Sequence, residues 1–478
     1  MKKVNLFGAD TKSLSAFISA QRRLNCYYEV LPSGEKDSKV VIRGTPGFTL
    51  FTTIPAAPIR GFLAVNNTLY VVGGNSLFSV NNAGVVTTIG SLGTITNEVV
   101  AMANNGVQLI IGTGSSGYIY TYSTSTLSII SSSGFPQSTT SIVFMNGFFV
   151  AQNPGTGQFF VSDVYDGTTW DPLQFATAET TPDDLLVVSA LHGDLVLWCQ
   201  HHTEFWQDNG GSPMPFAQLV GTAQDWGLAA VNSVAYFNNT LAFLAQNVQG
   251  QVQIMALNGY APQRISNHNI ENIINSFAVT SDAIALSYIT DGHPMYQITF
   301  PSANRSFLYE GINNIWSEVQ TGVSPQARHA ANIGVSFAGA YCFSDSTTGN
   351  IYQFDNTVYT DNGTPIKREL DSMHIENQGN ILGIDELWLD FELGQGLQIG
   401  QGSNPQIMLQ VSKDNGNTFG NERWTSIGKV GQYGGPRAIY RRFGQSRDFV
   451  FKIRMTDPVP FILVRGSAIV RTSREAGK

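Results

Sequence analysis

The sequence has few charges, few cysteines and no long apolar run, and each shortage argues against a class of protein. Charged residues make up 13% of the 478 residues, about half the usual share. The three cysteines (Cys26, Cys199 and Cys342) are far apart and form no CxxC pair, so neither a zinc site nor a disulfide framework is predicted. No run of about 18 apolar residues exists, so no membrane insertion is expected.

A signal peptide is also not predicted. The N-terminal stretch MKKVNLFGADTKSLSAF has two early lysines, but Asp10 and Lys12 interrupt its apolar residues. We therefore expect the protein to be made and kept in a cytoplasm.

Helical spacing is scarce as well, and strand-and-turn patterns take its place. Small turns such as Asn-Asn, Asn-Gly, His-Gly and Asp-Gly recur, each followed by an apolar strand, a loop and usually a second strand. The turns lie near residues 66, 105, 146, 192, 238, 291 and 338, roughly 39 to 53 residues apart. A period of about 40–50 residues is typical of four-stranded propeller blades. The repeats diverge enough that an array of β-sandwiches is the alternative.

The sequence therefore predicts an all-β protein with three segments. Residues 61–365 are expected to form a β-propeller of six or seven blades. Residues 366–478, with strands such as DELWLDFEL and FVFKIRM, are expected to form a basic, β-sandwich-like docking platform. Residues 1–60 form an N-terminal segment that could complete this platform.

The few charges are unevenly distributed along the chain. Residues 1–43 carry 8 Lys and Arg against 4 Asp and Glu, residues 44–412 carry 6 against 26, and residues 413–478 carry 13 against 5. An acidic middle of net −20 therefore lies between basic ends of +4 and +8. Segregation of this kind bears on partners rather than on fold, because an acidic block repels nucleic acid and a basic one attracts acidic surfaces or phosphate.

One short motif raises the question of enzymatic activity. SKDNGNTF matches the Asp-box pattern of sialidase-like propellers, with its motif positions at Ser412, Asp414, Gly416, Thr418 and Phe419. These residues serve a turn, since Asp414 can accept backbone hydrogen bonds and Gly416 supplies an unusual φ. Sialidase-like enzymes also need an arginine triad, and the acidic middle has few arginines, among them Arg60 in a sequence unlike that family's. We expect a turn and no catalytic residue.

Other candidate sites are weak. GTGSSG, from Gly112 to Gly117, follows a strand but precedes β sequence, so a Gly-rich turn is predicted rather than a dinucleotide site. His202 and Glu204 share one face of an expected strand, which is an incomplete ligand set for a metal. No catalytic, cofactor-binding or metal site is predicted.

A second, looser box points to a family. The stretch from Phe160 to Gly211 contains SDVYDGTTWD, followed by FATAE and TEFW, and its turn residues are Asp163, Asp166, Gly167 and Trp170. This pattern resembles the packaged-DNA stabilisation proteins of short-tailed bacteriophages, also called tail accessory factors or tail nozzles. RGTPGF at Arg43 to Phe48 and the closing basic strands resemble the same family more weakly.

The resemblance implies a ring of normally six copies below the portal and its head–tail adaptor. Such rings close the channel after packaging, retain viral DNA without sequence specificity and open for ejection. Tail fibres or spikes, and a tail needle or plug, are further implied partners. The expected location is the virion tail, with assembly from the host cytoplasm.

The charge pattern adds two hypotheses to this resemblance. The acidic middle is expected to line or surround the channel, where it lets DNA slide. The basic ends are expected to dock on the adaptor, with Arg441, Arg442, Arg447 and Arg454 as candidate docking residues; ordinary surface arginines are the alternative. The competing function is a propeller that binds or cleaves glycans, as a sialidase or depolymerase does.

Overall fold

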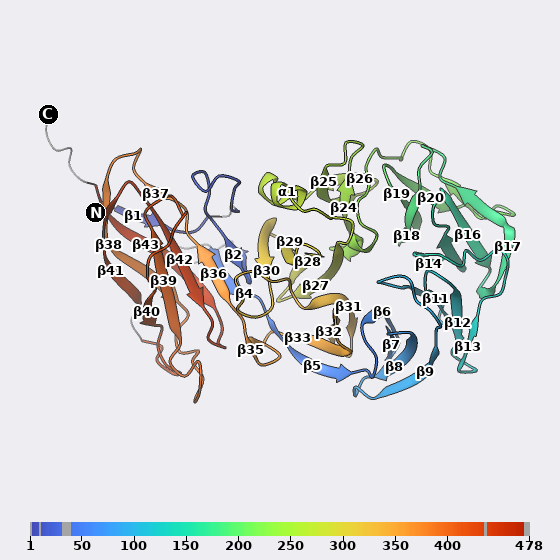
Figure 1. The fold of residues 1–478 in the computed structure, drawn as a ribbon, viewed down its shortest axis with the longest axis horizontal. Helices are drawn as coiled ribbons and strands as arrows, with labels where there is room; N and C mark the ends of the chain where they lie inside the picture. The colour runs from blue at the N-terminus through green and yellow to red at the C-terminus, as the bar shows by residue number, and fades with distance from the viewer. Residues whose placement is uncertain (1, 9–10, 31–39, 435–436, 473–478) are drawn as a thin grey trace.

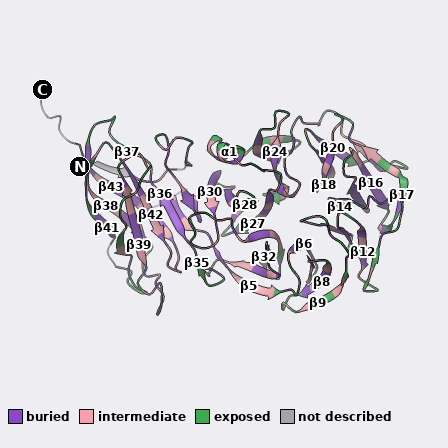
Figure 2. Cartoon of the chain, in the orientation of Figure 1, coloured by how far each residue is buried: buried purple, intermediate pink, exposed green. Residues whose placement is uncertain are grey.

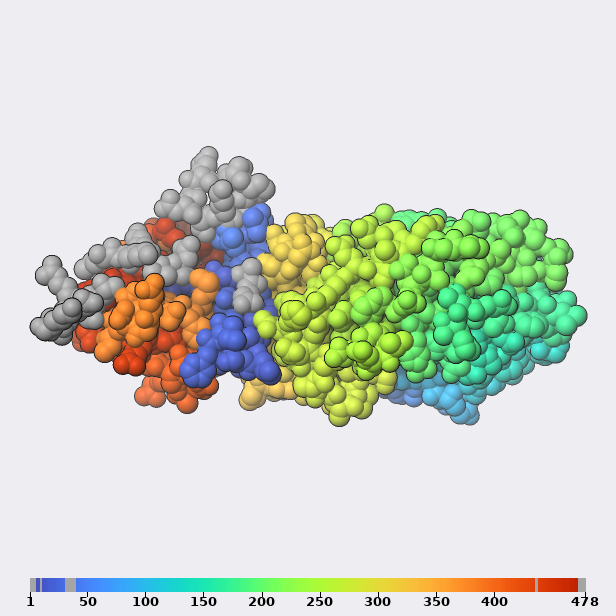
Figure 3. All heavy atoms as spheres, turned by 90° about the horizontal axis from the view of Figure 1, so that it is seen from above, coloured from blue at the N-terminus to red at the C-terminus, as the bar shows by residue number. Residues whose placement is uncertain are grey.

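Two all-β domains lie side by side along the longest axis of the molecule (Figure 1). The structure is a computed structural model that describes residues 2–8, 11–30, 40–434 and 437–472. A β-propeller occupies one end and a β-sandwich the other, and the N-terminal residues, blue in Figure 3, lie between them. The prediction of a propeller with a sandwich-like second domain is confirmed.

The propeller has seven blades among the described residues, each built on a four-stranded antiparallel sheet. Blade 1 contains β6 (Ile59–Val65), β7 (Thr68–Gly73), β8 (Ser76–Asn81) and β9 (Val86–Ser91). Blade 2 contains β10 (Ala101–Asn104), β11 (Gln108–Gly112), β12 (Gly117–Thr121) and β13 (Thr126–Ile129). Blade 3 contains β14 (Ile142–Met145), β15 (Phe148–Gln152), β16 (Gln158–Asp163) and β17 (Asp166–Thr177). Blade 4 contains β18 (Leu185–Leu191), β19 (Asp194–Cys199), β20 (Thr203–Asp208) and β21 (Phe216–Gln218).

The remaining blades are less regular. In blade 5 the 3₁₀ turn η1 (Val231–Ser233) splits the inner strand into β22 (Gly227–Leu228) and β23 (Ala235–Phe237). Both parts pair with β24 (Thr240–Gln246), and β25 (Val252–Asn258) and β26 (Ala261–Arg264) complete the blade. Helix α1 (His268–Asn275) leads to blade 6, which contains β27 (Ile284–Thr290), β28 (His293–Phe300), β29 (Arg305–Glu310) and β30 (Ile315–Val319). Blade 7 contains β31 (Ala331–Phe337), β32 (Ala340–Asp345), β33 (Asn350–Asp355) and β5 (Gly47–Thr53), and β34 (Thr360–Asp361) and β35 (Thr364–Pro365) extend it.

The recurring turns of the sequence are the hairpins between the first and second strands of the blades. Asn66, Asn146, His192, Asn238, Asp291 and Ala338 have φ between +46° and +53°, and Gly106 has φ +85° at the equivalent place. Positive φ is the conformation that tight two-residue hairpins require. The apolar run after each turn is the second strand, which is buried between neighbouring blades on both faces.

Strand β19 shows how the blades hold together. Five of its six residues are buried, and the ring centroid of its Trp198 lies 4.3 Å from that of Phe243 in the next blade. Burial of one such large apolar side chain stabilises the fold by about 1.5–3 kcal/mol. Figure 2 shows the buried residues inside the blades and the exposed residues on outer strands such as β17.

The sandwich consists of two packed sheets with a shared apolar core. The first sheet contains β3 (Cys26–Val30), β4 (Val40–Gly44), β43 (Ile462–Thr472), β38 (Leu382–Phe391) and β41 (Ala438–Ser446), and β1 (Lys2–Asn5) pairs with β43. The second contains β36 (Arg368–Asp371), β42 (Asp448–Met455), β39 (Gln406–Ser412) and β40 (Arg423–Ser426), and β37 (Ile375–Glu376) pairs with β42. Leu387 and Leu389 of the first sheet face Phe451 and Ile453 of the second within this core.

The first 60 residues are shared between the two domains. Strands β1, β3 and β4 belong to the sandwich, whereas β5 forms the outer strand of blade 7. Between them, the two-residue strand β2 (Arg23–Leu24) pairs with β30 of blade 6 and with β36 of the sandwich. One continuous ten-stranded sheet therefore runs from the propeller into the sandwich.

Candidate functional site

The second box is a turn between β16 and β17 that fastens blade 3 to blade 2. The Asp166 carboxylate accepts hydrogen bonds from the backbone N and the hydroxyl of Thr168, at 2.9 and 2.7 Å, and from the Thr169 hydroxyl at 3.0 Å. The Gly167 N donates to Gln108 of blade 2 at 2.8 Å, and a Cβ on Gly167 would lie 2.4 Å from Ile110. Burial alone would raise the pKa of Asp166, but these hydrogen bonds hold it below its usual value. The residues therefore serve a structural turn.

Two further residues of this turn complete it. The Trp170 indole is 2% exposed, and its Nε1 donates to the Gly167 carbonyl at 2.8 Å. Asp163 pairs with Asp166 at the end of the hairpin, and its side chain is exposed.

The first box joins β39 to β40 in the sandwich. Asp414 accepts hydrogen bonds from the Ser412 hydroxyl at 2.6 Å and from the backbone N and hydroxyl of Thr418 at 2.9 and 2.6 Å. These bonds lower the pKa of Asp414 to about 2. Gly416 has φ +80°, and the Lys452 ammonium lies 4.2 Å from the ring centroid of Phe419. The box thus forms a well-bonded turn that packs on the sandwich.

The junction between the domains contains a network of charges that the sequence did not indicate. Arg22 donates to Glu318 of blade 6 at 2.7 Å and to Glu369 of the sandwich at 2.9 Å. Burial would lower the pKa of Arg22, but the two carboxylates raise it above its usual value. Lys452 and Arg454 also pair with Glu369, at 3.6 and 2.8 Å. The pKa of Glu369, which burial alone would raise, is lowered to about 2 by these cations.

The four candidate docking arginines lie in different settings. Arg454 pairs with Glu369 and with Glu422, and its side chain is 27% exposed. Arg441 is 61% exposed and pairs with Glu386 at 2.8 Å. Arg442 and Arg447 are exposed, and neither forms an ion pair with another described residue. Of these four arginines, Arg442 and Arg447 are therefore the ones whose charge is free to meet a partner.

Most of the propeller carries only negatively charged side chains. Residues 61–263 contain blades 1 to 4 except the first two residues of β6, and nearly all of blade 5; they include no Lys or Arg and 11 Asp and Glu. Blades 2, 3 and 4 lie at the end of the molecule farthest from the sandwich (Figure 1). The anionic part of the molecule and its cationic sandwich are thus at opposite ends of the longest axis.

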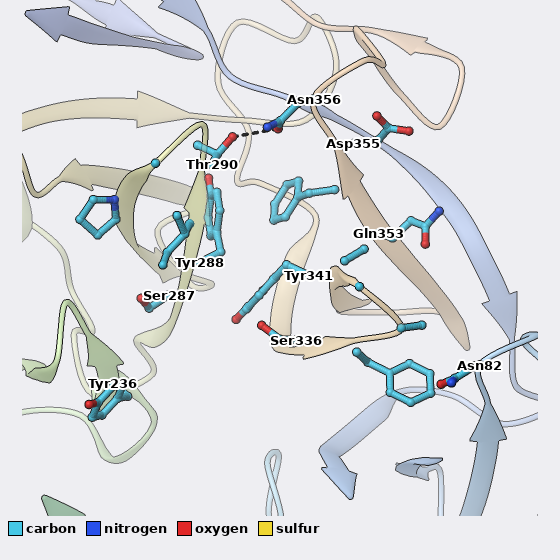
Figure 4. A pocket seen from close by; sticks show the side chains of 18 of the residues that line it. Asn82, Tyr236, Ser287, Tyr288, Thr290, Ser336, Tyr341, Gln353, Asp355 and Asn356 are labelled. Carbon is cyan, nitrogen blue, oxygen red and sulfur yellow. Dashed lines mark hydrogen bonds between the residues drawn. The ribbon is translucent and has the colours of Figure 1, made fainter. Parts of the chain in front are cut away.

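A large cavity opens on the propeller face that carries the first hairpin turns. It has a volume of about 1410 Å³, and its lining includes asparagines and tyrosines such as Asn82, Tyr236 and Tyr341 (Figure 4). Its one carboxylate, Asp355, accepts hydrogen bonds from its neighbour Thr357, and no Lys or Arg is among the described lining residues. This lining can meet neutral polar groups, but it does not assemble the arginine triad of a sialidase.

The remaining motifs are also structural. GTGSSG is the hairpin between β11 and β12. His202 is 2% exposed and lies between Asp183 and Glu204, each at 3.3 Å from one ring nitrogen. Burial alone would lower the pKa of His202, but hydrogen bonds and the charges of these carboxylates raise it. In the part of the chain that the structure describes, no group of three or more His, Cys, Asp and Glu side chains is arranged to hold a metal ion.

The described residues include no helix that is long and apolar enough to cross a membrane.

Solved structures resemble this chain only weakly. A chain of the crystal structure of the mitotic checkpoint complex is 11% identical over 68% of this chain and 96% of its own, with a TM-score of 0.43. The designed protein Ika8 is 11% identical over 68% and 96%, with a TM-score of 0.40. The extracellular domain of the hybrid two-component system BT4673 from B. thetaiotaomicron is 9% identical over 73% and 45%, with a TM-score of 0.46. A comparison with curated proteins finds no match.

The architecture defines the class as a seven-bladed β-propeller protein with a β-sandwich as its second domain. Residues 6–359 match the family described as Bacteriophage P22 Gp10, beta-propeller, and residues 367–471 match Bacteriophage P22 Gp10, beta-sandwich. The chain belongs to the bacteriophage P22 Gp10 family, whose members stabilise packaged DNA, and it is a phage structural protein and a virion component.

Proposed function

We propose that the chain forms a ring, six copies in the family's usual arrangement, below the portal and head–tail adaptor of a short-tailed phage. The ring closes the channel after packaging, retains the viral DNA and opens for ejection, and it has no enzymatic activity. It assembles from the host cytoplasm onto the virion tail, where fibres or spikes and a needle or plug contact it.

The observation that carries this proposal is the separation of charge along the molecule. Residues 61–263 of the propeller offer no Lys or Arg to DNA phosphates, so DNA that passes them is not held. The sandwich presents exposed arginines at the opposite end, where they can meet an acidic adaptor surface. The continuous sheet through β2 and the Arg22 ion pairs join the two ends firmly.

Docking on the purified adaptor tests this proposal. We expect Arg442→Glu with Arg447→Glu to weaken binding and to reduce its dependence on salt, because rim charges steer association and are screened by ions. Lys429→Glu, a charge reversal elsewhere on the exposed surface of the same domain, is the matched control. Equal binding of the double variant and the control would refute docking through these arginines.

A further inference from the structure

Three large apolar side chains are exposed on one short segment before β2. Leu14, Phe17 and Ile18 have exposed fractions of 89%, 68% and 78%, and we refer to these three residues as the apolar turn. Single exposed apolar residues are common, whereas three on one segment of five residues are the pattern expected of an interaction site. In Figure 3 the dark blue N-terminal residues lie at the surface between the sandwich and the propeller.

The backbone of this segment is held in place from both domains. The Thr11 carbonyl accepts a hydrogen bond from Asn269 of helix α1 at 3.0 Å. The Ala16 carbonyl accepts one from His374 Nε2 at 2.7 Å, while the other ring nitrogen of His374 faces Asp448 at 2.7 Å.

The Asp box and local turns add support. A Cβ on Gly416 would lie only 2.8 Å from the Ala20 methyl, so the first box packs directly on this segment. Within the segment, the Ser13 N donates to the Ser19 carbonyl at 3.0 Å. The apolar side chains are therefore presented on a fixed backbone, which lowers the entropy lost when they bind.

Cations lie on the elements that hold the apolar turn. Lys12 is part of the segment, Lys413 belongs to the first box, and Arg447 precedes Asp448; all three are exposed. A fitting partner surface is therefore apolar and acidic.

The propeller offers such a surface at its far end. Val107, Val164 and Tyr165 have exposed fractions of 53%, 61% and 60%, and we refer to these three as the rim patch. The Tyr165 carbonyl accepts a hydrogen bond from Asn105, so the tip of the second box lies beside the first hairpin of blade 2, between Asn105 and Gln108. The exposed Asp163 precedes this tip, and residues 61–263 contain no cation.

We propose that the apolar turn of one copy packs against the rim patch of a second copy. The two surfaces match in apolar character and are opposite in charge, and they lie on different parts of the chain. Such a contact is heterologous, and repeated contacts of this kind close into a ring when the rotation between copies allows it. The inference names an interface for the ring under Proposed function and rests on that ring.

Cross-linking between two single-cysteine variants tests the contact. Cys26, Cys199 and Cys342 are buried, so a short bismaleimide will react mainly at Phe17→Cys and Tyr165→Cys. We expect a cross-linked dimer when the two variants are mixed and none from either alone. Phe17→Cys mixed with Trp424→Cys, at a site 59% exposed outside both patches, is the control. A mixture that yields no more dimer than this control, or a wild-type chain that sediments as a monomer at every concentration, overturns the proposal.

A charge exchange gives a second measurement that does not depend on reactive cysteines. Lys12→Glu with Lys413→Glu should weaken self-association about tenfold, since exposed opposite charges contribute modestly to association. Adding Asp163→Lys on the partner copy should restore part of the loss, and no restoration contradicts the pairing. A failure of the proposed contact can be distinguished from a failure of the proposed tail function. Antibody labelling of particles detects the chain at the tail whichever surfaces join the copies.

Discussion

Arg22 provides the sharpest test of how the two domains are joined. Its guanidinium is 19% exposed and makes three charge-assisted hydrogen bonds, to Glu318 at 2.7 and 3.2 Å and to Glu369 at 2.9 Å. Removal of one partner of a buried ion pair costs about 3–5 kcal/mol. Both carboxylates keep other cations, so we expect Arg22→Ala to cost about 2–3 kcal/mol.

Hydrogen exchange followed by mass spectrometry gives the location of this loss, and urea unfolding gives its size. Exchange should accelerate in peptides that cover β2, β30 and β36, while blade 3 keeps its protection. Arg441→Ala is the control, because its pair with Glu386 is exposed to solvent and should contribute little to stability. An Arg22→Ala variant no less stable than this control, or one that loosens blade 3 equally, would refute the reasoning.

Three further changes test other parts of the structure. Gly167→Ala should cost about 1–3 kcal/mol in urea unfolding because its Cβ would meet Ile110, whereas Gly434→Ala, in open space, should stay within about 0.5 kcal/mol. Burial raises the pKa of Asp361 to about 7, so wild-type stability should fall by about 4 kcal/mol between pH 4 and pH 7 through this group, and Asp361→Asn should remove that slope. A variant with the wild-type slope would contradict this. The pKa of Asp414 is lowered to about 2, so the stability lost in Asp414→Asn should be constant above about pH 4 and vanish as pH falls through 2; a midpoint difference that vanishes near neutral pH would contradict the turn's role.

Local signals in the sequence were sufficient to predict the propeller blades. The first hairpin of a blade has a turn that needs positive φ, such as Asn146, and a buried apolar second strand follows it, such as β19 in blade 4. Both features depend on neighbours in the chain, so their period could be counted. The boxes were likewise predicted as turns, because the hydrogen bonds of Asp166 and Asp414 are local.

Contacts between distant segments could not be predicted in this way. Nothing near Arg22 in the sequence indicates Glu318 or Glu369, and nothing in GFTLFTT indicates that β5 pairs with β33. The basic C-terminal sequence also did not show which arginines are free to bind a partner. Glu369 and Glu386 lie earlier in the chain and pair with Arg454 and Arg441 only in the folded structure. The exposed apolar turn was missed because the exposure of a side chain depends on tertiary structure.

Immunogold electron microscopy of particles from an infected lysate tests the central claim most directly. An antibody against this chain should place gold at the single tail vertex, which would establish the protein as part of the tail. Particles without gold, beside soluble antigen in the same lysate, would contradict a tail component and make glycan-cleavage assays the next experiment.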